Sequence, residues 1–154
     1  MLDWLPLGTH SYHVEDDTFV LRGNGTLTVS DVESLYSICW GIGDRHDYWL
    51  VLVNSRAGMN MSPEARRRVG ELSRKRRSQN ATAIYGASII ERTLVLFITN
   101  AVRMIRGVAM PIETFQTEAE ARSWLAEQRR SLRASLIPGA GQGTPKSTAL
   151  PDAE

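Results

Sequence analysis

The sequence contains a single cysteine, Cys39, so the chain cannot form an internal disulfide. It also lacks a run of about 20 apolar residues, the length that a membrane-spanning helix needs. Its richest apolar segment, residues 89–105, is interrupted by charged side chains. Residues 1–10 show no basic leader followed by an apolar stretch. We therefore expect a protein of the reducing cytoplasm that does not span a membrane.

Signatures of catalysis and of cofactor binding are missing as well. No G-x-S-x-G motif is present, and the three histidines, at positions 10, 13 and 46, lack the spacing and the cysteine neighbours of a metal site. The GAGQG stretch at residues 139–143 follows no predicted strand and precedes no predicted helix, as a phosphate-binding loop would. We expect no enzymatic activity, no cofactor and no metal.

The charge balance shows no global attraction to polyanions, because the net charge is only +1. Residues 62–79, however, contain seven arginine and lysine residues, Arg67 among them, against two glutamates. This segment is either a solvated helix face or a surface that docks an acidic partner, and both interpretations stay open. Nucleic acid is not an expected partner, because no aromatic residues are interleaved with these arginines.

Helix starts are the clearest local signals in the 154 residues, which are enough for one domain. A Ser or Thr followed three residues later by Glu forms a reciprocal cap at a helix N-terminus. The pattern occurs at Ser30–Glu33, Ser88–Glu91 and Thr117–Glu120, and Ser62 precedes a proline at the first helical position. We therefore predict four helices, beginning near residues 30, 62, 88 and 117.

Strand-like runs lie between these helices. They are residues 11–15, 18–22, 48–53, 81–87 and 111–115, the first two forming a hairpin. This order predicts an α/β fold with a single-layer, mixed and mostly parallel sheet of about five strands and four helices. We expect residues 1–9 to form an N-terminal arm, residues 10–136 the domain, and the Gly- and Pro-rich residues 137–154 a disordered tail.

Three segments resemble STAS domains of the SpoIIAA-like family. They are the strand 110–115 leading into the helix 117–125, the Ser62-Pro-Glu-Ala-Arg66 helix start, and the Ile84-Tyr-Gly-Ala-Ser88 strand end. The resemblance covers about residues 10–134. It implies a regulatory or binding module, since the best-known STAS proteins antagonise anti-sigma factors. A more distant similarity to CRAL-TRIO lipid-transfer domains implies an apolar ligand as the second hypothesis.

The resemblance also implies a phosphorylation site at the turn after the central strand. STAS proteins are switched there by phosphorylation of a Ser or Thr that follows an aspartate. In this sequence Ser55 holds that place, and Asn54 stands where the family has the acidic residue. Ser55 is therefore the candidate phosphoacceptor.

The predicted third helix, residues 88–106, is apolar over much of its circumference. We expect Leu94, Phe97, Ile98, Ala101 and Ile105 to pack on the sheet. Such a broad apolar surface is explained by burial under another element, by a homodimer, by a different protein, or by an apolar ligand in a pocket beneath the helix. With the loop 54–62, it forms the predicted partner or ligand surface, represented by Arg56, Arg67, Ile90, Val95, Leu96 and Val102. A protein-interaction module is the leading prediction, and a ligand-binding module is the alternative.

Overall fold

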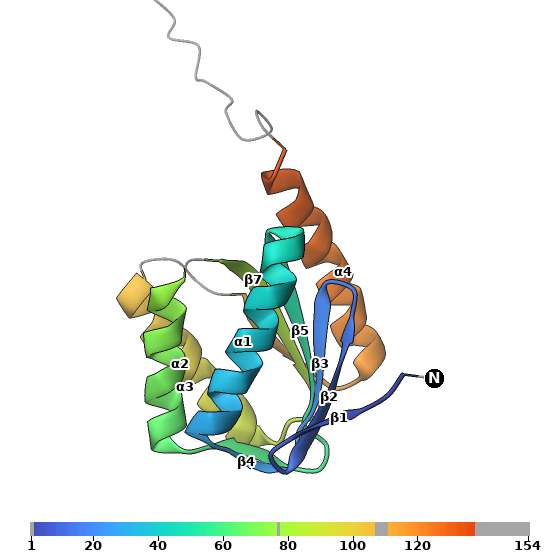
Figure 1. Ribbon diagram of the computed structural model, residues 1–154. Helices are drawn as coiled ribbons and strands as arrows, with labels where there is room; N and C mark the ends of the chain where they lie inside the picture. Colours follow the sequence, from blue (N-terminus) through green and yellow to red (C-terminus); the bar gives the residue numbers. More distant parts are fainter. Residues whose placement is uncertain (1, 77, 107–110, 138–154) are drawn as a thin grey trace, which may run out of the picture.

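The computed structural model describes residues 2–76, 78–106 and 111–137. In this part of the chain, four helices surround a sheet (Figure 1). The strands are β1 (Leu5–Leu7), β2 (His10–Glu15), β3 (Thr18–Arg22), β4 (Gly25–Leu27), β5 (Tyr48–Asn54), β6 (Met59–Met61), β7 (Gln79–Tyr85) and β8 (Ile112–Phe115). The helices are α1 (Val29–His46), α2 (Pro63–Lys75), α3 (Ile89–Arg106) and α4 (Glu118–Ser135). The predicted tail lies outside the described residues, except for Ile137.

The main sheet has six strands in the order β1-β2-β3-β5-β7-β8. β1, β2 and β3 are antiparallel neighbours, whereas β3, β5, β7 and β8 are parallel. The predicted α/β fold, with four helices and a mixed, mostly parallel sheet, is confirmed. The sixth strand, β1, comes from the expected N-terminal arm, where Leu7 is buried against the core.

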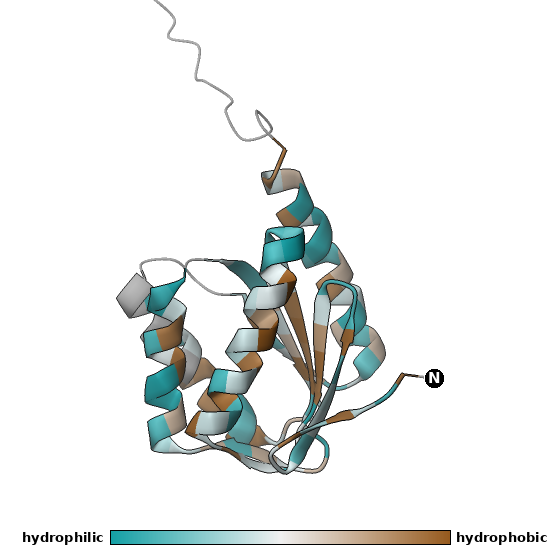
Figure 2. Cartoon of the chain, viewed as in Figure 1, coloured by the Kyte–Doolittle hydropathy of each residue, from teal (hydrophilic) through white to brown (hydrophobic). Residues whose placement is uncertain are grey.

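The central strand β5 is buried on both faces. Trp49, Val51 and Val53 belong to one apolar cluster with residues of α1 and α3. The alternate residues Tyr48, Leu50 and Leu52 belong to a second cluster with residues of α4. Because side chains alternate across a strand, this run places α1 and α3 on one face and α4 on the other. Figure 2 shows the resulting hydrophobic centre of the sheet.

The helix α2 packs on α1, with Ala65 and Leu72 buried beside Val32. Its start at Ser62 is confirmed, as are the predicted starts at Ser88 and Thr117. The predicted start near residue 30 is confirmed as well, since α1 begins at Val29, but the predicted cap is wrong because the capping residue is Thr28 and not Ser30. There the Thr28 hydroxyl accepts the Asp31 amide at 3.3 Å, and the Asp31 carboxylate accepts the Thr28 amide at 2.9 Å.

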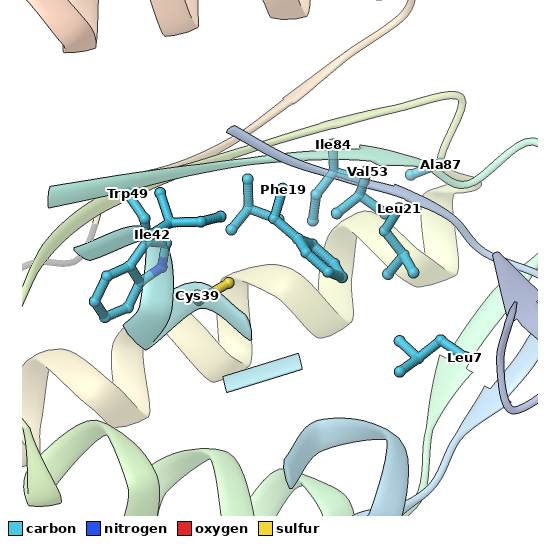
Figure 3. Close-up of a cluster of buried hydrophobic side chains, with 10 residues drawn as sticks. Leu7, Phe19, Leu21, Cys39, Ile42, Trp49, Val53, Ile84 and Ala87 are labelled. Atoms are coloured by element: carbon cyan, nitrogen blue, oxygen red, sulfur yellow. The ribbon is translucent and has the colours of Figure 1, made fainter. Parts of the chain in front are cut away.

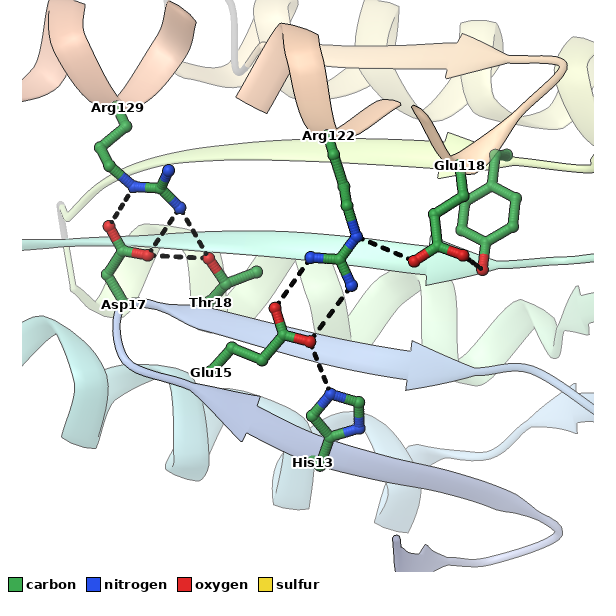
Figure 4. Close-up of polar contacts among 8 residues, drawn as sticks. His13, Glu15, Asp17, Thr18, Glu118, Arg122 and Arg129 are labelled. Carbon is green, nitrogen blue, oxygen red and sulfur yellow. Dashed lines mark hydrogen bonds and ion pairs between the residues drawn. The ribbon is translucent and has the colours of Figure 1, made fainter. Parts of the chain in front are cut away.

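Two arginines attach α4 to the β2–β3 hairpin (Figure 4). Arg129 donates to both carboxylate oxygens of the buried Asp17, at 2.7 and 3.0 Å. Arg122 makes the same two-pronged contact with Glu15, at 2.8 and 3.1 Å. Paired hydrogen bonds of this kind fix the orientation of α4 relative to the hairpin as well as its position.

Candidate functional site

The turns that follow the parallel strands meet at the carboxyl edge of the sheet. The amide of Ser55, after β5, donates to Tyr85 O at 2.9 Å, and the amide of Gly86, after β7, donates to Phe115 O at 3.2 Å. In open α/β sheets, ligands bind outside the carboxyl ends of the strands, which is this edge. The structure therefore brings the loop 54–62 beside the N-terminus of α3.

The loop 54–62 is more ordered than its polar composition indicates. Residues 59–61 form β6, which pairs in parallel with β4 in a separate two-stranded sheet. The Gly25 amide also donates to Gly58 O at 2.9 Å. The loop thus connects β5 to α2 while its backbone groups pair with β4, a segment about 30 residues earlier in the chain.

Glu91, in the first turn of α3, ties this loop to the helix. Its carboxylate accepts the Met59 amide at 2.6 Å, the Ser55 hydroxyl at 3.2 Å and the Ser88 amide at 2.5 Å. Burial raises the pKa of Glu91, but the amides of Met59 and Ser88 outweigh burial and hold the pKa below its usual value. The sequence identifies Glu91 only as half of a helix cap; its contact with the loop depends on the fold.

The candidate phosphoacceptor Ser55 lies inside this arrangement. Its residue is 2% exposed, and its hydroxyl faces the Glu91 carboxylate. The side chain of Arg56 points away from Ser55. Its guanidinium lies 5.4 Å from the ring centre of Tyr85, which belongs to the apolar cluster on the α4 side of the sheet. This position of the Arg56 side chain requires a glycine at residue 86, because a Cβ there would lie 2.4 Å from Arg56 Cγ. Phosphorylation of Ser55 stays a prediction.

One face of α3 carries a row of exposed hydrophobic side chains. They are Ile89, Ile90, Leu96 and Phe97, with exposed fractions of 83%, 81%, 64% and 69%. We call these four residues the α3 outer face, because 3.6 residues per turn place them on one side of the helix. Leu94 faces inward as expected, but the expectation that Phe97 packs on the sheet is wrong, because Phe97 is exposed and Val95 faces inward in its place.

Val95 and Val102 therefore differ from the other predicted surface residues. Val95 packs against the core cluster on the inner side of α3 rather than on its outer face. Val102 belongs to α3, but its side chain lies outside the described part of the structure. Ile90 and Leu96 belong to the outer face.

A cavity of about 170 Å³ lies beneath α3, between the helices α1 to α3 and the sheet. Val51 and Ile84 line it from the sheet, Cys39 from α1 and Val95 from α3. Ser55 and Glu91 also line it, so the cavity and the tethered loop share one boundary. Ligand binding in this cavity is untested.

The basic helix α2 contacts α3. Arg68 forms ion pairs with Glu33 and Glu71, and Arg76 pairs with Asp44. Arg67, Arg74 and Lys75 are exposed and have no ion-pair partner within the described residues. Arg66 is also exposed and donates to the Met61 carbonyl, so four side chains carry the unpaired positive charge of α2 among the described residues.

The described residues also limit the other kinds of site. No three His, Cys, Asp or Glu side chains among them lie close enough to hold a metal ion together. None of the helices in this part of the chain is both long and apolar enough to cross a membrane.

No family model matches the sequence, and no curated protein matches it. Among solved structures, an uncharacterized DUF3478-family protein with a SpoIIAA-like fold, from Shewanella loihica PV-4, aligns with a TM-score of 0.53. The two are 15% identical, over 76% of this chain and 92% of that chain. This chain has a SpoIIAA-like, or STAS, fold.

A second solved structure also aligns with this chain. It is the anti-sigma factor antagonist SpoIIAA in its unphosphorylated form, with a TM-score of 0.44 and 16% identity. The alignment covers 82% of this chain and 98% of SpoIIAA.

Proposed function

We propose that this protein is a non-enzymatic regulatory module that binds another protein through the α3 outer face and the adjoining loop 54–62. The observation that carries the proposal is the exposure of Ile89, Ile90, Leu96 and Phe97 on one side of one helix. Contiguous apolar residues on the surface of a folded domain typically mark an interaction site. The SpoIIAA-like fold is consistent with such a role.

The charges beside this face indicate the chemistry of the partner. Arg67, Arg74 and Lys75 on the neighbouring α2 are exposed without an ion-pair partner among the described residues. A partner whose apolar side chains are flanked by carboxylates matches both helices. Its apolar side chains would contact the α3 outer face, and its carboxylates would pair with the cations of α2. A second copy of this chain would instead bring another basic helix to the interface, where like charges repel. The proposed partner is therefore a different, acidic protein.

Phosphorylation of Ser55 is the switch that we attach to this proposal. A phosphate adds a charge of about −1.5 to −2. At Ser55 it would face the ionised Glu91 carboxylate 3.2 Å away and replace their hydrogen bond with repulsion. The loop would then separate from the N-terminus of α3, beside Ile89 and Ile90. Because Ser55 is buried, the kinase must act on a conformation in which the loop has already opened.

Surface variants test the binding proposal. We expect Leu96→Glu and Arg67→Glu each to reduce recovery of the partner from native cell extract at least tenfold, without lowering the thermal midpoint. The matched controls are Leu136→Glu and Arg130→Glu, which place the same changes at exposed positions of the chain beyond α2 and α3. Unchanged recovery with both test variants would show that the proposal is wrong.

Two further measurements separate the remaining outcomes. Sedimentation of the pure protein reports self-association, and a dimer that Leu96→Glu converts to monomer would mean that the face binds a second copy. Intact mass under denaturing conditions, with peptide mapping, reports the switch. A phosphate on Ser55 of protein from its own cells supports it, and phosphate at other positions alone contradicts it.

A further inference from the structure

The cavity beneath α3 is a separate feature from the α3 outer face. It lies on the inner side of the helix, where Val95 meets the side chains of β5 and β7. Figure 3 shows the neighbouring core, with Val53 and Ile84 on the sheet and Cys39 on α1. Binding of a protein to the α3 outer face does not involve this cavity, so the cavity needs a separate explanation.

The described lining of the cavity is mostly apolar, and the polar side chains along it are those of Tyr36, Ser55, Asn60, Asn80, Thr82 and Glu91. It combines aliphatic side chains of the sheet with Leu35 and Cys39 of α1, Val69 of α2 and Leu94 of α3. Water needs two to four polar partners, and an apolar cavity of about 150 Å³ stays dry and binds benzene or xenon. An unfilled space of 170 Å³ deprives its lining of packing contacts, so an apolar occupant would restore them.

The polar groups of the cavity restrict what can enter. Glu91 and Ser55 stand together at its boundary, and the amides that bind Glu91 keep its carboxylate ionised. A carboxylate accepts about four hydrogen bonds. Glu91 uses three in the contacts with Met59, Ser55 and Ser88, which leaves room for one more donor. A ligand hydroxyl fits this position, whereas an anionic ligand is repelled.

We propose that this cavity is a binding site for a small, neutral, apolar molecule about the size of one aromatic ring, with at most one hydrogen-bond donor. The volume sets the size, because a cavity of about 150 Å³ accommodates benzene. A myristoyl chain has roughly twice as many carbon atoms as benzene and exceeds the space. The ligand is therefore a free small molecule and not the tail of a membrane lipid or a fatty acid.

Benzene, phenol and benzoate are the probes that test this site. At ten times the dissociation constant, benzene and phenol should raise the thermal midpoint of the wild type by about 3–6 °C. Benzoate should cause no shift, because its carboxylate would lie near that of Glu91. If benzoate raises the thermal midpoint as much as phenol does, the assignment of Glu91 as the polar end of the site is wrong. If benzene leaves the thermal midpoint unchanged, the proposed site is wrong.

Two matched variants on α3 locate the binding. Val95→Phe fills the cavity from its inner side, whereas Leu96→Phe makes a similar change on the exposed outer face. Benzene should shift Leu96→Phe as it shifts the wild type, and should leave Val95→Phe unchanged. Ala87→Val, in the turn between β7 and α3, is a smaller filling change for use if Val95→Phe does not fold. Equal benzene shifts in every folded variant would show that benzene binds elsewhere and would overturn the proposal.

Discussion

Asp17 is the residue at which burial and charge compete most directly. Burial raises its pKa, but hydrogen bonds from Arg129, Tyr48 and Thr18 outweigh burial and lower the pKa from 3.8 to about 2. The folded-state pKa thus lies below the ordinary value. Asp17 therefore contributes stability that is fully present above pH 4 and is lost as the pH falls from about 4 to 2.

Unfolding at several pH values checks this contribution. Between pH 5 and pH 2, we expect the free energy of unfolding of the wild type to fall by about 1–2 kcal/mol more than that of Asp17→Asn. Asp16→Asn changes the exposed neighbour in the same turn and should follow the wild type. Glu15, whose hydrogen bonds with Arg122 lower its pKa to about 2, contributes equally in all three proteins. Parallel curves for the wild type and Asp17→Asn would contradict the prediction.

At the scale of single elements, the start of α1 shows how two overlapping patterns compete. Both Thr28–Asp31 and Ser30–Glu33 have the spacing of a reciprocal cap. The structure uses the first, because Thr28 then follows directly after β4. We expect Thr28→Ala to lower the free energy of unfolding by about 1 kcal/mol, as the loss of an N-cap does. Ser30→Ala, inside the helix, should change it by less than about 0.5 kcal/mol.

A chemical denaturation series on these two variants is the measurement. Equal losses in Thr28→Ala and Ser30→Ala would mean that the helix start frays between the two caps. A larger loss in Ser30→Ala would restore the cap that the sequence alone predicts.

The orientation of α3 about its own axis cannot be read from the sequence of the helix. Its apolar residues occupy most of the circumference, so periodicity does not distinguish the side that faces the sheet. The direction is set by contacts from elsewhere: Glu91 anchors the first turn to Met59, and Val95 enters the core. Periodicity therefore predicts Phe97 on the side of the sheet and Val95 on the remainder, and the structure reverses both.

At the scale of the whole molecule, β1 extends the folded unit into the segment expected to be an arm. Leu7 is buried in the core, whereas Leu5, two residues earlier in the same strand, is half exposed. We expect Leu7→Ala to lower the free energy of unfolding by about 2–3 kcal/mol, as truncation of a buried leucine does. Leu5→Ala should cost less than about 1 kcal/mol.

Urea unfolding of both leucine variants tests the boundary of the domain. A loss in Leu7→Ala no greater than that in Leu5→Ala would mean that residues 1–9 are an arm, as the sequence indicates. The larger loss at Leu7 would extend the domain to include β1.

The sequence by itself determined the α/β class, the order of the four helices and five of the strands, and three of the four helix caps, because caps and apolar alternation act over a few residues. Only the tertiary structure decided the rest: the pairing of β4 with β6, the contact of Arg129 with Asp17, the hold of Glu91 on the loop and the cavity beneath α3. Each of these joins residues far apart in the chain. Their partners are selected by packing in three dimensions, which no local spacing encodes.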